Sequence, residues 1–99
     1  MAAYVIGDSQ VLDADALAKY RALSQVAVAK YGGKYLVRGG AGETIEGTWK
    51  PGVLAILEFP SLEAAHTWYE SPEYREARVF ARKGIDRDLI FVEGVAKQP

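Results

Sequence analysis

The residue with the clearest capacity for chemistry is Arg38, which ends a strand-like run and precedes a glycine-rich segment. Residues 34–38 read Lys-Tyr-Leu-Val-Arg, an aromatic and β-branched stretch that favours a strand. Residues 39–42 read Gly-Gly-Ala-Gly and allow backbone turns that other residues disfavour. The pattern therefore places one guanidinium at the end of a sheet. Its planar fork suits bidentate recognition of a carboxylate.

Two roles for Arg38 are open at this level. It can bind a small anionic molecule, or it can form a structural ion pair with Glu58 on the neighbouring part of the sheet. Tyrosines can line a pocket with apolar walls and a few hydroxyl donors, although the same residues can instead be aromatic core. We predict a ligand-binding site made of Arg38, Glu58, Tyr69 and Tyr74.

The single histidine, His66, is the one weak candidate for a catalytic residue, because imidazole titrates in a useful range. His66 and Glu70 stand four residues apart and could share a metal, but two ligands without a third do not define a site. Ser71 is typical of a helix cap rather than a nucleophile. We therefore predict no metal site and assign no further catalytic residue.

The glycines after Arg38 do not form a nucleotide-binding motif. Gly42 and Gly47 have the spacing of a phosphate loop, but Thr48-Trp49 follows where Lys-Ser or Lys-Thr is needed. No helix start follows that could receive a pyrophosphate. The sequence thus predicts no organic cofactor, and the glycines most simply allow a sharp connection between strands.

Composition narrows the class of protein. Its 99 residues fit one domain, 1–99, and the formal net charge is −1 from 12 basic and 13 acidic residues. This balance gives no field that would recruit nucleic acid or an anionic membrane. The sequence has no cysteine, which excludes disulfides and thiolate metal sites. The first residues lack the pattern of a signal peptide, so a cytoplasmic location is expected.

The elements that must position these residues follow from periodicity and turn signals. Strands are expected over about 3–10, 34–38, 43–46 (short), 53–59 and 88–95. One helix begins at the cap Asp13 and ends at Gly32-Gly33, and another begins at Ser61, breaks at Ser71-Pro72 and fades near Gly84. The order β-α-β-β-α-β is the split unit of α+β ferredoxin-like folds with an antiparallel four-stranded sheet.

Both faces of this sheet are apolar by strand alternation. Val53, Ala55, Leu57 and Phe59 share one face, while Leu54 and Ile56 share the other with Glu58. Strict alternation also sets Tyr35 and Val37 against Leu36. Two helices cover only one face, so we predict a face-to-face homodimer; the alternative is a monomer with two partly apolar faces. Trp49, in a loop, is a candidate contact with the partner subunit.

Several segments together resemble a known family. They are Tyr20-Arg21, residues 31–40 (Tyr-Gly-Gly-Lys-Tyr-Leu-Val-Arg-Gly-Gly), Leu57-Glu58-Phe59-Pro60, residues 68–74 (Trp-Tyr-Glu-Ser-Pro-Glu-Tyr) and Val92-Glu93-Gly94-Val95. The chain resembles the DUF1330 family of the dimeric α+β barrel superfamily, over nearly its whole length. The resemblance implies a ferredoxin-like protomer and a homodimer, and it supplies no function.

Two functional hypotheses remain from the sequence. The first is a small-molecule enzyme or binder that recognises an anionic ligand near Arg38. The alternative is a non-catalytic dimeric module that senses a ligand or acts through its interface. Relatives in the superfamily perform unrelated reactions, so the fold does not choose between the two.

Overall fold

The computed structural model describes residues 1–96, and within them the chain forms four strands and three helices. They are β1 (Ala3–Val11), α1 (Ala14–Lys30), β2 (Lys34–Arg38), β3 (Val53–Phe59), α2 (Leu62–Glu70), α3 (Pro72–Gly84) and β4 (Ile85–Glu93). In this part of the chain, no helix is long and apolar enough to cross a membrane.

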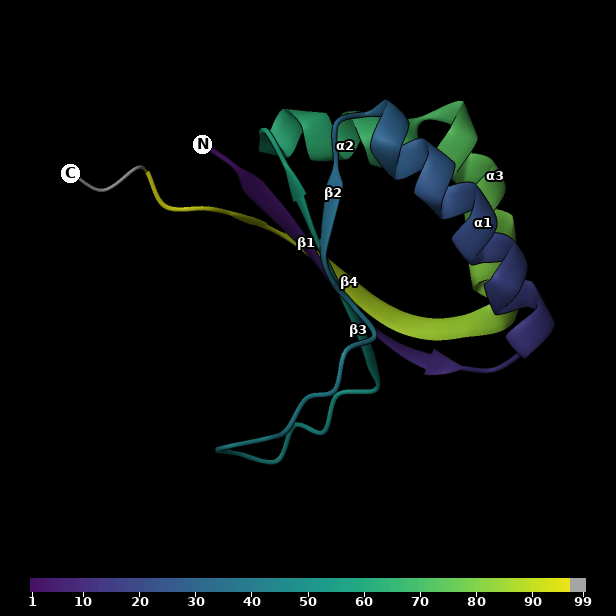
Figure 1. Ribbon diagram of the computed structural model, residues 1–99, viewed down its shortest axis with the longest axis vertical. Helices are drawn as coiled ribbons and strands as arrows, with labels where there is room; N and C mark the ends of the chain where they lie inside the picture. The colour runs from purple at the N-terminus through teal and green to yellow at the C-terminus, as the bar shows by residue number, and fades with distance from the viewer. Residues whose placement is uncertain (97–99) are drawn as a thin grey trace.

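The strands form one antiparallel sheet in the order β2-β3-β1-β4. All three helices lie on the same side of this sheet (Figure 1). Burial alternates along β1, where Ala3 and Val5 are fully buried beneath the helices while Tyr4 and Ile6 on the other face are partly exposed. The predicted α+β ferredoxin-like fold with a four-stranded antiparallel sheet is confirmed.

Short polar side chains set the helix boundaries, as their positions in the sequence predict. The Asp13 carboxylate accepts from the backbone N–H groups of Asp15 and Ala16 at 2.9 and 3.3 Å. The Ser71 hydroxyl donates to the carbonyl of Trp68 at 2.7 Å and accepts from the N–H of Tyr74 at 3.1 Å. Ser71 therefore ends α2 and begins α3 at once, which explains the break before Pro72.

The aromatic core lies between the helices and the sheet. Trp68, Tyr74 and Phe59 are its largest fully buried side chains. The ring centroids of Trp68 and Tyr74 are 4.2 Å apart, and those of Trp68 and Phe59 are 5.1 Å apart. These contacts fix the junction of α2 and α3 against β3, so the Tyr74 hydroxyl is held at a defined place beneath the helices.

The short strand expected over 43–46 does not form, and that prediction is wrong. Residues 39–52 make an extended arm that projects away from the helices (Figure 1). A strand needs a partner for its backbone, and this segment leaves the sheet. The Thr44 hydroxyl donates instead to the carbonyl of Trp49 at 2.6 Å, and Gly47 adopts a positive φ of 87°.

The base of the arm is tied to β1 through Asp8. Its carboxylate accepts from the Trp49 indole N–H at 2.8 Å and from the Gly52 backbone N–H at 2.7 Å. Trp49 is nevertheless 61% exposed. Asp8 therefore fixes how the arm leaves the sheet while the indole stays accessible.

β4 begins earlier than expected. It spans Ile85–Glu93 rather than about 88–95, because β1 continues to Val11 and pairs there with Ile85. The correction matters for function because it places Arg87 within the strand. Arg87 then shares the helix-covered face with Leu89 and Phe91.

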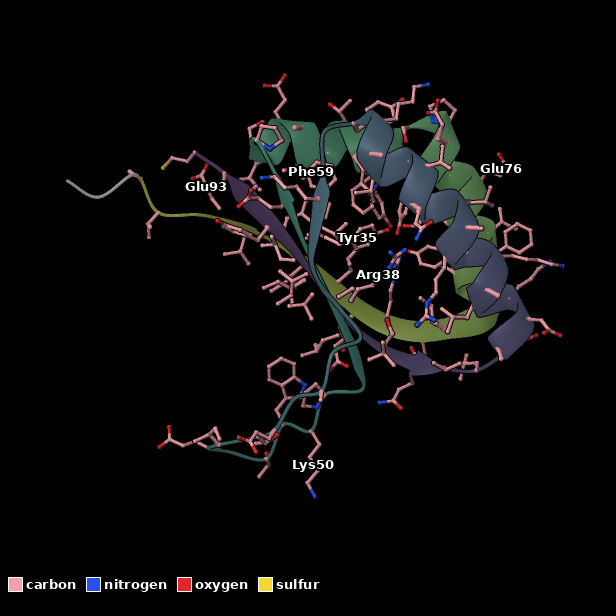
Figure 2. All side chains as sticks on the ribbon, viewed as in Figure 1. Tyr35, Arg38, Lys50, Phe59, Glu76 and Glu93 are labelled. Atoms are coloured by element: carbon pink, nitrogen blue, oxygen red, sulfur yellow. The ribbon has the colours of Figure 1, made fainter. Side chains whose placement is uncertain are left out.

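A β-bulge in β2 corrects the expected faces of that strand. Tyr35 pairs with Leu57, but Val37 pairs with Ile56, so one extra residue lies between the two pairs. Val37 therefore does not share the face of Tyr35. Arg38 pairs with Ala55 and joins Tyr35 on the side that faces α1 (Figure 2).

The face of the sheet without helices is apolar, which confirms the prediction that both faces are. We call it the open face and define it by six residues: Tyr4, Ile6, Leu54, Ile56, Ile90 and Val92. Ile90 is 53% exposed and Val92 is 42% exposed. Large exposed apolar patches on small proteins mark interaction surfaces.

Candidate functional site

A cavity of about 70 Å³ lies between α1 and the helix-covered face of the sheet. Its polar side chains come from every layer of the fold. They include Tyr20, Arg21, Tyr35, Arg38, Tyr74 and Arg87. The rest of its wall is largely apolar, with Leu17, Leu57, Trp68 and Leu89 among the contributors.

The inner polar group of the cavity is a cluster that we call the Arg87 cluster, made of Arg87, Tyr20 and Tyr74. The two terminal nitrogens of Arg87 donate to the hydroxyls of Tyr20 and Tyr74 at 3.0 and 2.9 Å. The two phenol oxygens are themselves 2.7 Å apart and share a hydrogen bond. Strand β4, helix α1 and helix α3 therefore meet at one guanidinium.

Burial sets the protonation state of this cluster. It raises the pKa of the Tyr74 phenol well above its usual value, and the neighbouring Tyr20 acts in the same direction. Burial alone would lower the pKa of Arg87, but the phenols of Tyr74 and Tyr20 hold it above its usual value. The cluster is a guanidinium cation beside a neutral Tyr74 phenol.

Arg38 lies at the mouth of the cavity and is exposed. Its guanidinium carbon stacks 4.2 Å from the centre of the Tyr35 ring. With its amide oxygen facing Arg38, Gln25 accepts from both terminal nitrogens at 2.9 and 2.6 Å. Outside this point a groove of about 540 Å³, lined in part by Arg21, continues from the cavity into solvent.

Glu58 does not join this site. It lies on the open face, where its carboxylate is 3.5 Å from the Lys34 ammonium. The bulge in β2 turns Arg38 to the other face, so the Arg38–Glu58 ion pair that the sequence left open does not form. The structural contacts of Arg38 are instead with Gln25 and Tyr35.

The other candidate residues are divided between the cavity and the surface. Tyr74 lines the cavity, whereas Tyr69 packs beside it and faces a separate groove under the guanidinium of Arg78, 4.3 Å from its ring centre. His66 is exposed, with its ring 5.0 Å from that of Phe91. Among the described residues, no group of three His, Cys, Asp or Glu could hold a metal.

Sequence reasoning missed Arg87 and Tyr20. The sequence contains a signal for Arg87, because Ile85, Arg87, Leu89 and Phe91 share one strand face. An arginine on an otherwise apolar, buried face needs a polar or charged partner. The expected strand began at Asp88 and excluded it. The sequence pattern around Tyr20 does not indicate where its hydroxyl lies.

The fold and this cavity together define a small ferredoxin-like α+β protein with a polar site beneath its first helix. The chain belongs to the family DUF1330, a domain of unknown function, whose model matches residues 2–95. No curated protein matches the sequence.

Solved structures with the same fold carry varied descriptions. A protein of unknown function from Rhodopseudomonas palustris is 21% identical, with a TM-score of 0.79 over 97% of this chain and 84% of that one. SnoaB, a cofactor-independent oxygenase from Streptomyces nogalater, is 11% identical, with a TM-score of 0.70 over 99% and 97%. A dimeric ferredoxin-like protein from Bacteroides fragilis is 14% identical, with a TM-score of 0.58 over 94% and 96%. At these identities the likeness concerns the fold.

Proposed function

We propose that this protein binds a small organic anion in the cavity between α1 and the sheet. One observation carries the proposal: within residues 1–96, the cavity lining includes Arg21, Arg38 and Arg87 but no aspartate or glutamate. Arg87 is half-buried, and arginines in such positions ordinarily have an acidic partner. A ligand that brings its own negative charge supplies that partner.

The rest of the lining supports an organic ligand rather than an inorganic ion. Its wall is mainly apolar and aromatic, the usual composition of a small-molecule site with a few orienting polar groups. In this proposal the arginines attract and hold the anion, Tyr74 donates a hydrogen bond, and the apolar wall contacts the body of the ligand. Tyr69 and Glu58 have no place in it.

The lining favours binding over acid–base catalysis. Among its described residues there is no carboxylate and no histidine, so a general base of the common kinds is missing. His66 lies outside the cavity. A ligand-binding or ligand-sensing role therefore fits the site better than a proton-transfer enzyme does.

The proposed binding protein is a homodimer formed through the open face. Each large apolar side chain left in water there forgoes about 1.5–3 kcal/mol of burial. Structural neighbours from Bacteroides fragilis and Thermobifida fusca are described as dimeric. The arm of residues 39–52, which contains Trp49, projects away from the helices, on the side where a second protomer would lie (Figure 1).

Thermal unfolding with paired ligands tests the binding proposal. Short carboxylic acids should raise the Tm at neutral pH, while the corresponding amides should not. Only the ionised acids carry a negative charge that can pair with the arginines. A ligand at one hundred times its Kd stabilises by about 2.7 kcal/mol. Arg75→Met, an exposed arginine on α3 outside the cavity, is the control for Arg38→Met. Equal shifts with acids and amides would refute the proposal.

A further inference from the structure

We infer that the Arg87 cluster, and not Arg38, receives the charged end of the ligand, and that this end is a carboxylate on a short aliphatic stem. The inference rests on the proposed function and specifies its ligand. It follows from the hydrogen bonds, the charges and the size of the cavity.

The Arg87 cluster has more donors than acceptors. A guanidinium carries five N–H groups, and within residues 1–96 only two of them have partners, the Tyr20 and Tyr74 hydroxyls. The two phenols have two O–H groups, and their mutual hydrogen bond uses one. The other O–H has no acceptor in the described part of the chain. One hydroxyl and the remaining N–H groups of Arg87 therefore have no protein partner within residues 1–96, and Arg87 lines both this cavity and the groove beside Tyr69.

A further donor borders the same cavity. Trp68 is only 1% exposed and contributes to the cavity wall, and its buried indole N–H has no acceptor among the described residues. Buried polar groups without partners are rare in native proteins, and they call for a bound molecule or water. The excess of donors around this cavity is therefore not confined to one side chain.

An anion satisfies the cluster better than water does. A buried water can accept hydrogen bonds from these groups, but it leaves the guanidinium charge without a counter-ion in surroundings of low polarity. A carboxylate supplies both acceptor oxygens and the missing charge. Its two oxygens also match the fork of the guanidinium.

Arg38 is the weaker receptor because it is exposed to solvent, where an ion pair contributes little. Gln25 also accepts from both of its terminal nitrogens, and Tyr35 covers one face of the guanidinium. With Arg21 it makes the entrance of the cavity positive, which speeds the arrival of an anion more than it strengthens binding.

The volume limits what can accompany the carboxylate. A cavity of about 70 Å³ is small, so beside the carboxylate it leaves room for a short aliphatic stem against Leu57 and Leu89. Butyrate fits this description, and a larger ligand would extend past Arg38 into the groove.

The test compares butyrate with butyramide by isothermal titration of wild-type protein, Arg87→Met and Arg38→Met. We expect Arg87→Met to weaken butyrate binding by about one hundredfold or more, since it removes a charge-assisted pair. Arg38→Met should weaken it by less than about fivefold, as expected for an exposed charge. Tyr20→Phe should weaken it by about tenfold through the loss of one hydroxyl. Tyr31→Phe, outside the cavity, is the matched control.

Each outcome decides between the two proposals. If Arg38→Met abolishes binding while Arg87→Met retains it, the inference is overturned and the proposed function stands. If butyramide binds wild-type protein as tightly as butyrate, both fail. If neither binds, the inference fails, and the thermal unfolding with other acids and amides decides the proposed function. If Arg87→Met does not fold, Arg87→Gln decides. It keeps an amide N–H donor near the two phenols and removes the charge, and unchanged butyrate affinity would then reject the cluster as the receptor.

Discussion

The two faces of the sheet are built from the same four strands, yet they differ in what they leave unsatisfied. The covered face, beneath α1, contains guanidinium groups that have no acidic partner among residues 1–96, around a small cavity. The open face has one ion pair within residues 1–96, Lys34 with Glu58, and leaves apolar side chains exposed beside Asp8 and Asp88. The first lacks negative charge, and the second lacks an apolar cover.

The difference shows that strand alternation can give the two faces of one sheet separate roles, one lining the cavity and the other forming the proposed dimer interface. Odd positions of β1 and β4 face the cavity, and even positions face the proposed partner. The bulge in β2 adds one change to this scheme, because it moves Arg38 from the open face to the entrance of the cavity. Substitutions at neighbouring positions should therefore affect one task and spare the other.

The largest effect is expected from Ile90→Asp on the open face. Ile90 pairs with Ile6 on β1 and is already 53% exposed in the protomer, so the single chain should still fold. A carboxylate facing its own copy adds desolvation and repulsion that should weaken the dimer by several kcal/mol. Light scattering should give twice the 10.8 kDa chain mass for wild-type protein and a single chain mass for the variant.

Val79→Asp is the matched control for this variant. Val79 lies on α3 and is 44% exposed, so it introduces the same charge on the helix side of the molecule. It should leave the dimer intact. A wild-type protein that stays at 10.8 kDa at micromolar concentration would contradict the dimer, as would an unchanged mass for Ile90→Asp.

A smaller effect, on stability alone, is expected from Gly33→Ala beneath the helices. A Cβ at this position would lie 2.6 Å from Cζ of Phe59 and 2.9 Å from Cγ1 of Val28, both in the core. Forcing these side chains apart should lower the free energy of unfolding by about 1–3 kcal/mol, measured by urea denaturation. Gly40→Ala in the arm has no atom within 4 Å of the added carbon and should cost much less. Equal losses for the two variants would contradict the packing described here.

The fold was predictable because its signals are local or periodic. Caps at Asp13, Ser61 and Ser71 each satisfy backbone N–H groups within three residues along the chain, so their sequence positions suffice. The apolar alternation of β3 likewise predicts two faces. The strand over 43–46 failed because strand formation needs a distant partner, which no local pattern specifies.

The site was predictable only in part, because it depends on contacts between distant residues. Arg38 could be singled out by its place at a strand end. The Arg87 cluster joins residues 13 to 67 positions apart, and the bulge that turns Arg38 has no sequence signal that we used. Glu58 was assigned to the same site by proximity along the sheet, and its position on the opposite face excludes it.

The smallest expected effect concerns Glu73, which ties α1 to α3 above the cavity. Its carboxylate accepts hydrogen bonds from Lys30 and from Tyr31, the latter at 2.8 Å. These bonds, with that from Lys30 first, lower the pKa of Glu73 from 4.5 to about 2. Because the folded pKa lies below the unfolded one, the stabilisation is present above about pH 4.5 and is lost as the pH falls towards 2.

Glu73→Gln should therefore lower the free energy of unfolding at pH 7 and have little effect near pH 2. The comparison is the difference between wild-type and variant proteins in urea denaturation across this range. Other carboxylates titrate in both proteins, so their contributions cancel in this difference.

The hydrogen bond to Glu73 also raises the pKa of Lys30, so the difference in free energy of unfolding should shrink again as the pH rises above 10.5. A difference that stays constant from pH 7 to pH 2 would mean that the contact is not electrostatic. Because Glu73 is far from the open face, the dimer mass at neutral pH should not change, which separates this contact from the one tested by Ile90→Asp.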